Sequence, residues 1–245
     1  MSNNSMTLGQ KLKSYKRTPL SFLMMLLVLL SAVITFAVLI FLIAYVLING
    51  VPYLKPSLFS LTYTSENASL MPALINTVIM TLLSLLIAVP FGIFSAIFLV
   101  EYAGRGNKFV EVIRLTTETL QGIPSIVYGL FGMLFFVSTC GWGFSILAGA
   151  FTLSIMVLPL IMRSTEEALK QCRILQRRKL RIGCGETSYG VSHCTSVCVP
   201  GILAGVILAV GRIVGETAAL IYTAGTFTKI PNSVMDSGRT LAVHM

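Results

Sequence analysis

The chain has 245 residues, of which 55% are hydrophobic and 11% are charged, with a mean hydropathy of +0.86. A typical soluble domain carries about 25% charged residues, so this composition excludes a water-soluble globule. The net charge of +9 would suggest nucleic-acid binding in a soluble chain, but here the basic residues lie in short loops between apolar blocks, and no nucleic-acid partner is expected. Blocks of about 20 or more apolar residues predict an all-α polytopic membrane protein, surrounded by membrane lipid.

Five membrane spans are visible as apolar blocks. They are expected, after an N-terminal tail formed by residues 1–21, at about 22–47, 74–100, 119–138, 143–162 and 201–224. The first block is too long for a cleaved signal peptide and no cleavage site follows it, so it is interpreted as a retained helix. Pro90 interrupts the second block, which a membrane helix tolerates when its neighbours satisfy the freed backbone groups. Residues 22–245 are therefore expected to form one transmembrane domain.

The distribution of basic residues predicts how the chain is threaded through the membrane. Fourteen of them lie in the N-terminal tail and in the loops after the second and fourth spans, whereas three lie in the alternate loops. By the positive-inside rule, the N-terminus is expected in the cytoplasm. Five spans then place the C-terminus outside, and because no capping segment follows Leu241 to Met245, the chain is interpreted as truncated.

Only the last span carries charged residues at membrane depth, namely Arg212 and Glu216. An ionisable residue there costs roughly 2.5–3.5 kcal/mol on insertion scales, so both residues need a physical reason. One reason is a structural ion pair, because residues four apart on a helix are neighbours. The other is a substrate pathway, in which Arg212 presents its planar donor fork to an oxyanion and Glu216 holds that fork in place. The sequence leaves both alternatives open.

The start of the third span carries two further features. Glu118 lies at the expected cytoplasmic start of this span, where an interfacial helix cap is favoured over a pathway role. Glycine and proline then recur from Gln121 through Ser125 to Gly132. That spacing permits either close helix packing, which is the commoner outcome, or an interrupted helix that lines a cavity.

The sequence predicts no catalytic residue, cofactor or metal site, and hence no enzyme. No GxxxxGK[ST] loop is present, so ATP would have to bind to another subunit if it drives this protein. Four of the five cysteines, together with His193, lie between residues 171 and 199. Their spacing matches no paired-knuckle zinc pattern, so we expect no metal there.

Four stretches carry a resemblance to a known family. They are residues 122–132 (GIPSIVYGLFG), 163–170 (RSTEEALK), 200–220 (PGILAGVILAVGRIVGETAAL) and 235–244 (MDSGRTLAVH). Together they resemble the PstA-type permease subunit of bacterial phosphate ABC importers, over most of residues 20–245. The resemblance implies the MetI-like bundle of type I ABC importer permeases, with six spans, in the bacterial inner membrane.

The resemblance also implies partners and residue roles. A second, homologous permease subunit would complete the pathway, two ATP-binding subunits would drive it, and a periplasmic or lipid-anchored binding protein would deliver phosphate. The residues expected along the substrate pathway are Arg212, Glu216, Glu118, Gln121 and Ser125. The residues expected to lead into the coupling loop are Thr165, Glu166 and Glu167. A permease for another oxyanion, such as molybdate or sulfate, is the alternative.

The coupling loop itself departs from the family pattern. The motif E-A-A-x3-G-x9-I-x-L-P is absent after the fourth span, where residues 171–199 are instead basic and cysteine-rich. When this stretch is back-translated with chosen synonymous codons and three single bases are restored, it reads E-G-S-x3-G-x9-I-V-L-P. We therefore predict a frameshift across 171–199. The alternative is that the chain as printed is the translation of a damaged or misread gene, does not bind the ATP-binding subunit and has no activity.

Overall fold

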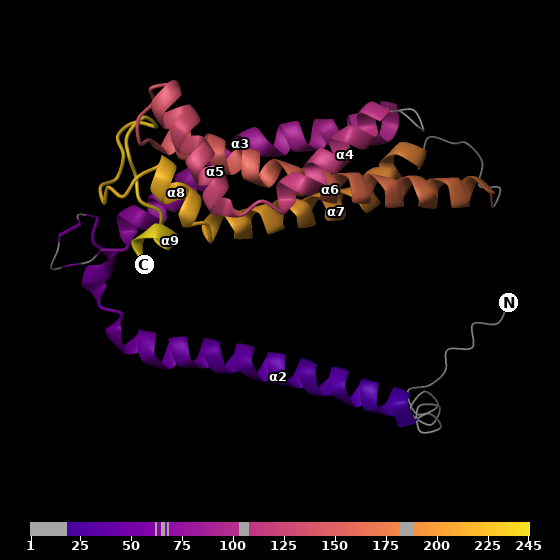
Figure 1. Ribbon diagram of the computed structural model, residues 1–245, viewed down its shortest axis with the longest axis horizontal. Helices are drawn as coiled ribbons and strands as arrows, with labels where there is room; N and C mark the ends of the chain where they lie inside the picture. The colour runs from indigo at the N-terminus through magenta and orange to yellow at the C-terminus, as the bar shows by residue number, and fades with distance from the viewer. Residues whose placement is uncertain (1–18, 62, 65–66, 68, 103–107, 182–188) are drawn as a thin grey trace. The chain divides into compact units, whose positions relative to one another are not determined.

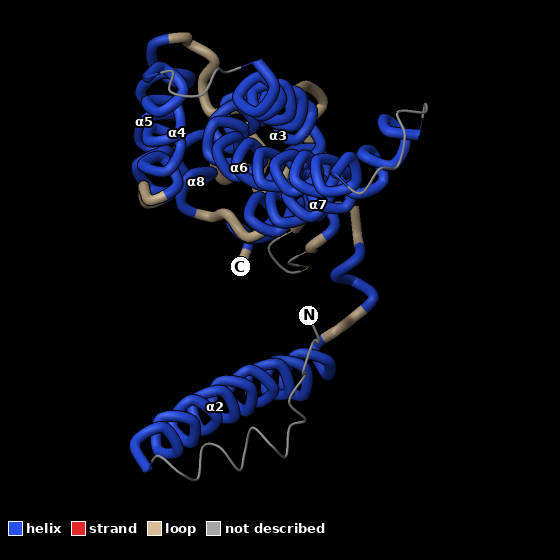
Figure 2. Tube along the Cα trace, turned by 90° about the vertical axis from the view of Figure 1, so that its right-hand side faces the viewer, coloured by secondary structure: helices blue, strands red, loops and turns tan. Residues whose placement is uncertain are grey.

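The computed structural model describes residues 19–61, 63–64, 67, 69–102, 108–181 and 189–245, with side chains described for these residues except 19, 101–102, 173–181 and 189–197. All regular elements in this described part are helices (Figure 1), and its trace contains no strand (Figure 2). The expected all-α class is therefore confirmed. The chain divides into two units, Met1–Pro56 and Ser57–Met245, and each is described by itself.

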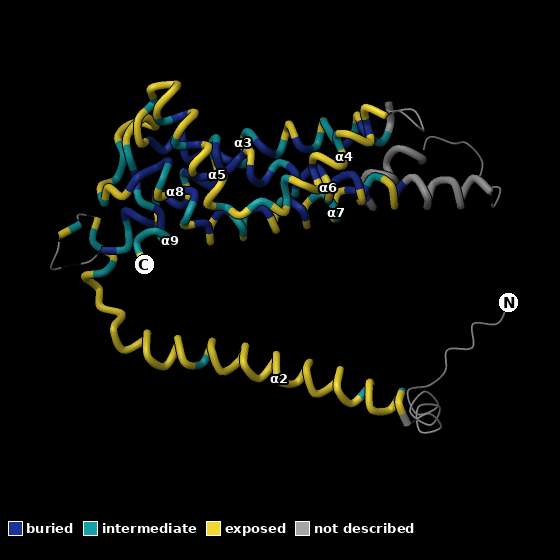
Figure 3. The backbone as a smooth tube through the Cα atoms, viewed as in Figure 1, coloured by how far each residue is buried: buried dark blue, intermediate teal, exposed yellow. Residues whose placement is uncertain are grey.

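The first unit contains α2 (Pro19–Gly50), a single apolar helix followed by the short 3-10 helix η1 (Val51–Tyr53). The 32 residues of α2 rise about 48 Å at 1.5 Å per residue, which exceeds the roughly 30 Å of a hydrocarbon core. Its large apolar side chains are exposed along the whole helix (Figure 3). Because lipid tails are as apolar as leucine, such a helix is suited to a bilayer. It contains the span expected at 22–47.

Three long helices form the core of the second unit. They follow the 3-10 helix η2 (Pro56–Phe59) and are α3 (Met71–Ile97), α6 (Ile146–Arg181) and α7 (Tyr189–Val214), with the π-helical turn η3 (Phe98–Tyr102) directly after α3. Helix α6 packs against both α3 and α7, and α3 also contacts α7. Met80, Leu153 and Val157 are fully buried between these helices. Figure 1 and Figure 2 agree in placing the three helices side by side.

Small residues bring these helices close together. A Cβ atom on Gly92 of α3 would lie 2.8 Å from the side chain of Ile161 in α6. A Cβ atom on Gly201 of α7 would lie 2.6 Å from the Cβ atom of Ala168 in α6. Neither distance is tolerable for a side chain, so glycine is required at both crossings. In a membrane, where helix association depends on close packing, such contacts stabilise the bundle.

The helix expected at 119–138 is broken. It consists of α4 (Lys108–Gln121), then α5 (Ser125–Gly132) and the π-helical turn η4 (Met133–Thr139), and the two halves are bent by 101°. Pro124 has φ −58° and ψ 141°, a conformation that cannot continue α4. Helix packing is found as well, because a Cβ atom on Gly129 would lie 2.8 Å from the Cα atom of Ala219. The helix is therefore both interrupted and closely packed, and a cavity lined by its break stays a prediction.

A tight turn joins η4 to α6. Gly141 and Gly143 have φ values of 70° and 64°, which glycine adopts without the strain that a side chain would cause. Between them, Trp142 stacks on Phe136 of η4 with a centroid distance of 5.4 Å, and it also contacts Phe151 of α6. The aromatic cluster fixes η4 against the start of α6.

The segment expected as one span at 201–224 is also divided. Helix α7 ends at Val214, and α8 (Ala218–Thr223) begins after a turn at residues 215–217. An irregular loop then leads to α9 (Leu241–His244). By length and composition, the described part contains three helices able to cross a membrane, at Leu20–Tyr53, Met71–Val100 and Ile146–Cys172. The bent pair α4 and α5 gives a fourth span if it is counted as one, and Cys198–Val214 is a shorter apolar helix.

Candidate substrate pathway and coupling cluster

Arg212 lies near the C-terminal end of α7, half-buried and exposed to a cavity of about 670 Å³. The other residues that line the cavity are Leu160, Ala204, Ile207, Leu208 and Gly211. Its walls are therefore apolar apart from the guanidinium. Among the described residues, no hydrogen bond or ion pair involves the Arg212 side chain. A cation in such a setting is available to an anionic ligand.

The charge of Arg212 reaches the broken helix. It acts electrostatically on the hydroxyl group of Tyr128, a buried residue in α5. That hydroxyl donates a hydrogen bond to the carbonyl oxygen of Leu120 in α4, at 2.8 Å. Tyr128 thus spans the break between α4 and α5 and lies within the field of Arg212. The sequence analysis missed this residue because a tyrosine in an apolar block carries no distinctive signal.

Glu216 does not hold the guanidinium of Arg212. Its side chain is buried, and Oε1 accepts a hydrogen bond of 3.2 Å from the backbone N–H of Ala219. A carboxylate at this place satisfies a free N–H group in the first turn of α8 and opposes the positive end of the helix dipole. Because α7 ends at Val214, Arg212 and Glu216 do not share a continuous helix. The ion pair considered for them is absent from the described residues, and Glu216 caps α8 instead.

Gln121 and Ser125 flank the break between α4 and α5. The side-chain Nε2 of Gln121 donates a hydrogen bond of 3.0 Å to the carbonyl oxygen of Pro159 in α6. Ser125 is half-buried and begins α5. The structure therefore brings Gln121 to the middle of α6 and leaves Ser125 at the bend.

Glu118 has a different role from the expected helix cap. Helix α4 begins at Lys108, about ten residues before the apolar block, so Glu118 lies in its last turn, where an acidic residue is not favoured by the helix dipole. Its carboxylate is exposed and faces Arg163 of α6, with an Oε1 to Nη1 distance of 3.7 Å. The expectation of a cap at Glu118 is wrong because α4 extends through charged residues that hydrophobicity alone does not assign to a helix.

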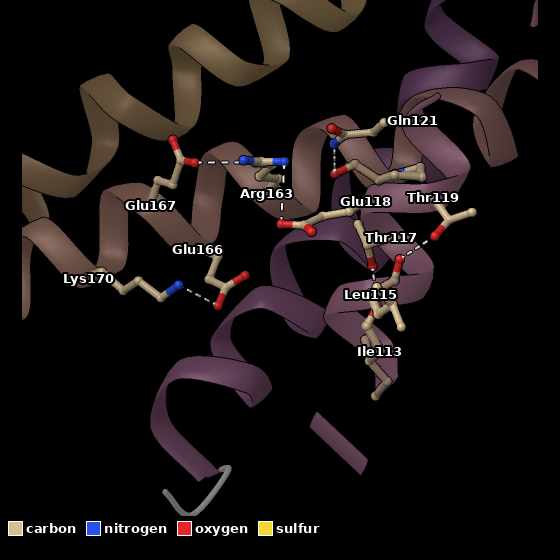
Figure 4. Close-up of polar contacts among 11 residues, drawn as sticks. Ile113, Leu115, Thr117, Glu118, Thr119, Gln121, Arg163, Glu166, Glu167 and Lys170 are labelled. Carbon is tan, nitrogen blue, oxygen red and sulfur yellow. Dashed lines mark hydrogen bonds and ion pairs between the residues drawn. The ribbon is translucent and has the colours of Figure 1, made fainter. Parts of the chain in front are cut away.

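Glu166 is the most buried carboxylate of the group that precedes the coupling loop. Its Oε1 atom lies 2.7 Å from Nη2 of Arg114 in α4 and 2.8 Å from Nζ of Lys170 in α6, although its side chain is only 8% exposed. Glu167, one residue on, is 61% exposed and pairs with Arg163 at 3.3 Å. Figure 4 shows the carboxylates of Glu118, Glu166 and Glu167 with their partners on α6.

Thr165 lies on the inner side of the same turn of α6. It is fully buried, and within the described part its hydroxyl group has no hydrogen-bond partner. The residues that complete this cluster, Arg114, Arg163 and Lys170, entered the sequence analysis only as topology signals. For Arg163 and Lys170, the spacing of four residues from Glu167 and Glu166 was the available signal for ion pairing, whereas nothing in the sequence indicated that Arg114 pairs with Glu166.

The segment in which a frameshift is predicted, 171–199, is described only in part: its backbone is helical at 171–181 and 189–199, and residues 182–188 lie outside the described part. Side-chain positions are described there only for Gln171, Cys172, Cys198 and Val199. The frameshift stays a prediction of the sequence analysis, and so does the expectation that the cysteines and His193 bind no metal. Residues 1–18 of the expected N-terminal tail also lie outside the described part.

A bundle of apolar helices, with one broken helix and a lone guanidinium exposed to an apolar cavity, defines a multi-pass membrane protein of the solute-conducting kind. No protein-family model matches the chain. It is 34% identical over 235 residues to the probable ABC transporter permease protein YqgI of Bacillus subtilis, covering 88% of this chain and 79% of the relative. It is 33% identical over 226 residues to the phosphate transport system permease protein PstA of Haemophilus influenzae, covering 89% and 78%.

A third relative, PstA of Pasteurella multocida, is 35% identical over 183 residues, which cover 72% of this chain and 63% of the relative. Sequence identity at this level over most of the chain is sufficient to assign the chain to a family. The chain belongs to the PstA family of ABC transporter permease proteins. The resemblance drawn from the sequence motifs is thereby confirmed, and so is the assignment to the ABC permease fold class.

Proposed function

We propose that this chain is a membrane-spanning subunit of an ATP-driven importer of inorganic phosphate and forms half of its translocation pathway. The observation that carries this proposal is family membership over most of the chain, together with a guanidinium in an apolar cavity. Relatives described as phosphate transport permeases favour phosphate over molybdate or sulfate as the substrate.

Phosphate carries one to two negative charges, and its passage through a low-dielectric path requires a fixed cation. Arg212 supplies this charge, and its planar fork can donate two parallel hydrogen bonds to a phosphate. Electrostatic attraction is stronger in an apolar cavity than in water, because the effective dielectric constant is lower. Gln121 and Ser125, on either side of the α4 and α5 break, supply polar groups along the same path. Glu216 contributes by anchoring α8 against α5 rather than by contacting phosphate.

The remaining parts of the transporter belong to other subunits. A second, homologous permease subunit would form the other half of the pathway, and two ATP-binding subunits would hydrolyse ATP. A periplasmic or lipid-anchored protein would deliver phosphate from outside. We place the subunit in the bacterial inner membrane, and the excess of basic residues in the N-terminal tail, in residues 105–114 and in the second half of α6 supports a cytoplasmic N-terminus. Thr165, Glu166 and Glu167 then lie on the cytoplasmic side, next to the coupling loop.

Uptake in proteoliposomes tests this proposal, with the transporter assembled from its other subunits and this chain with the reading frame across 171–199 restored. We expect ATP-dependent accumulation of radiolabelled phosphate that unlabelled phosphate inhibits, and that sulfate and molybdate at the same concentration do not inhibit. Inhibition by sulfate or molybdate as strong as that by phosphate would assign the chain to another oxyanion. Vesicles that lack this subunit are the control for uptake by the other components.

A further inference from the structure

Helix α4 is attached to α6 by a stripe of polar contacts that lies beside an apolar cluster, to which Val110 and Ile113 of α4 and Met162 and Leu169 of α6 belong. Most of α4 is exposed, and its only buried residues are Val110 and Thr117. Three residues of α4, which lie four and then three positions apart, each contact one residue of α6. Their partners on α6 lie three and then four positions apart, in the reverse order along the chain. From the cytoplasmic end of α4 to the break, the contacts are Arg114 to Glu166, Glu118 to Arg163, and Gln121 to Pro159. We call this set the α4–α6 ladder.

The order of these contacts shows that the two helices run antiparallel. As the residue number rises on α4, that of its partner falls on α6. The ladder extends from the turn of α6 that precedes the coupling loop to Pro159, inside the same helix. It therefore connects the end of α6 that leads toward the loop with the point where α4 breaks.

The ion pairs of the ladder are not needed to neutralise α6. Glu166 already has Lys170 as a partner on its own helix, and Arg163 already has Glu167. Pairs at this spacing stabilise a helix without help from outside. The added partners from α4, Arg114 and Glu118, therefore contribute a link between helices rather than charge compensation. Because Glu166 is only 8% exposed, the link to Arg114 is screened less by salt than the pair formed by Glu118.

Beyond the break, the contacts continue toward the cavity. Tyr128 of α5 is hydrogen-bonded to Leu120 at the end of α4. Gly129 of α5 lies directly against Ala219 of α8, with no room for a side chain between them. The same Ala219 donates to Glu216, at the turn that follows α7. An unbroken series of contacts thus runs from Glu166 through α4 and α5 to the turn beside Arg212.

We propose that Arg114 and Glu118 are positioning residues that make α4 move together with the cytoplasmic part of α6. A displacement of α6 at the coupling loop then reaches α5 through the break at residues 122–124. The proposal rests on the proposed function for the source of that displacement, which is ATP-driven movement of the partner subunits. Coupling between distant sites requires such a physical chain of contacts, and its demonstration requires a measured effect at the far end.

Hydrogen–deuterium exchange of the full chain in lipid nanodiscs tests the link without any transport. The double variant Arg114→Gln with Glu118→Gln removes both ion pairs from α4 and leaves the pairs within α6 intact. We expect exchange to rise about tenfold in residues 108–121 and also severalfold in residues 125–132, because local opening of α4 is transmitted to α5. A rise confined to 108–121 would show a local structural role and overturn the proposal.

The matched control removes one cation and one anion from the same helix, in the double variant Lys108→Gln with Glu111→Gln. Both residues are exposed, and neither belongs to the ladder. We expect exchange in residues 125–132 to stay at the wild-type level, and an equal rise in the control would contradict the proposal.

If the ladder variant also loses protection in α3, it has unfolded, and the single variant Arg114→Lys, which keeps the charge, replaces it. That variant is expected to retain most of the protection in 125–132, and loss of protection as complete as in the double variant would count against the ladder.

Transport by the assembled complex supplies the second readout. We expect the ladder variant to retain ATP hydrolysis while phosphate imported per ATP falls about tenfold, which is the signature of lost coupling. Unchanged import per ATP would contradict the proposal. Variant and reference complexes both carry the restored reading frame across 171–199. If this reference complex imports no phosphate, the proposed function fails, and the exchange experiment still decides whether α4 follows α6.

Discussion

Two charged regions of the second unit differ in whether their charges are paired. In the α4–α6 ladder and its neighbours, three basic residues face three acidic ones, and each lies within 4 Å of an opposite charge. At the cavity beside α7, the guanidinium of Arg212 stands among apolar side chains and pairs with no described residue. Glu216 lies four residues after Arg212, but its carboxylate accepts a hydrogen bond from the backbone N–H of Ala219 in α8.

The difference separates charges that maintain the fold from a charge that is free to act on a ligand. Paired charges at a helix interface neutralise one another, and removal of such a pair alters the stability of the protein or the position of the helix. An uncompensated charge at membrane depth contributes nothing to stability that would offset its cost of insertion. We therefore expect substitutions in the two regions to give different phenotypes.

The largest effect is expected at Arg212. Replacement by alanine removes the only charge among the described residues that line the cavity, and phosphate uptake should fall by about 100-fold, as for loss of one member of a buried charge pair. Assembly, measured by co-purification with the partner subunits, should not change. Arg212→Lys keeps the charge but loses the planar fork, and an intermediate rate is expected. Uptake within threefold of wild type in the alanine variant would remove Arg212 from the pathway.

The coupling loop provides the second prediction. A chain with residues 171–199 as printed should not retain the ATP-binding subunit in a pull-down, whereas a chain with the reading frame restored should retain it. The physical reason is that the printed stretch lacks the spacing of the family motif. Sequencing of the coding DNA across this region checks the frameshift directly. An intact original frame, together with retention of the ATP-binding subunit by the printed chain, would contradict both predictions.

How far the sequence predicted the fold depended on the continuity of each apolar block. The blocks that became α2, α3 and α6 were found because an uninterrupted run of the right length has few other interpretations. The start of α4 was missed because Lys108, Glu111 and Arg114 interrupt hydrophobicity without interrupting the helix. The break after α7 was missed because Gly215, Glu216 and Thr217 are a short interruption between two apolar stretches, and a membrane helix tolerates a glycine.

The sequence predicted which charged residues belong to the candidate site, but it did not predict which of them pair. Arg212 and Glu216 were identified from their cost at membrane depth, which is a property of each residue alone. Their separation depends on where α7 ends, and that is decided by tertiary packing and by the capping of α8. Similarly, Glu166 was identified, whereas its partner Arg114 lies 52 positions away in the chain and is brought close only by the fold.

Glu166 and Glu167 provide a matched comparison of a buried and an exposed carboxylate on one helix. Glu166→Gln leaves Arg114 and Lys170 without their shared acceptor charge and should lower the free energy of unfolding by about 2 kcal/mol. Glu167→Gln breaks an exposed pair and should cost about 0.5 kcal/mol or less. Denaturation of the purified protein in mixed micelles, followed by the fluorescence of Trp142, measures both. Equal losses would show that burial does not distinguish the two residues.

A smaller effect than at Glu166 is expected at Glu216, and it decides which region this residue belongs to. As the cap of α8, its replacement by alanine should cost about 1 kcal/mol and raise hydrogen exchange in residues 218–223, whereas Glu216→Gln, which keeps an oxygen acceptor, should cost less. A residue that served Arg212 through its charge would behave in the opposite way, because glutamine would reduce phosphate uptake without changing exchange in α8. Uptake by Glu216→Gln close to the wild-type rate would place Glu216 with the charges that maintain the fold and leave Arg212 as the one charge in this pair that faces the substrate.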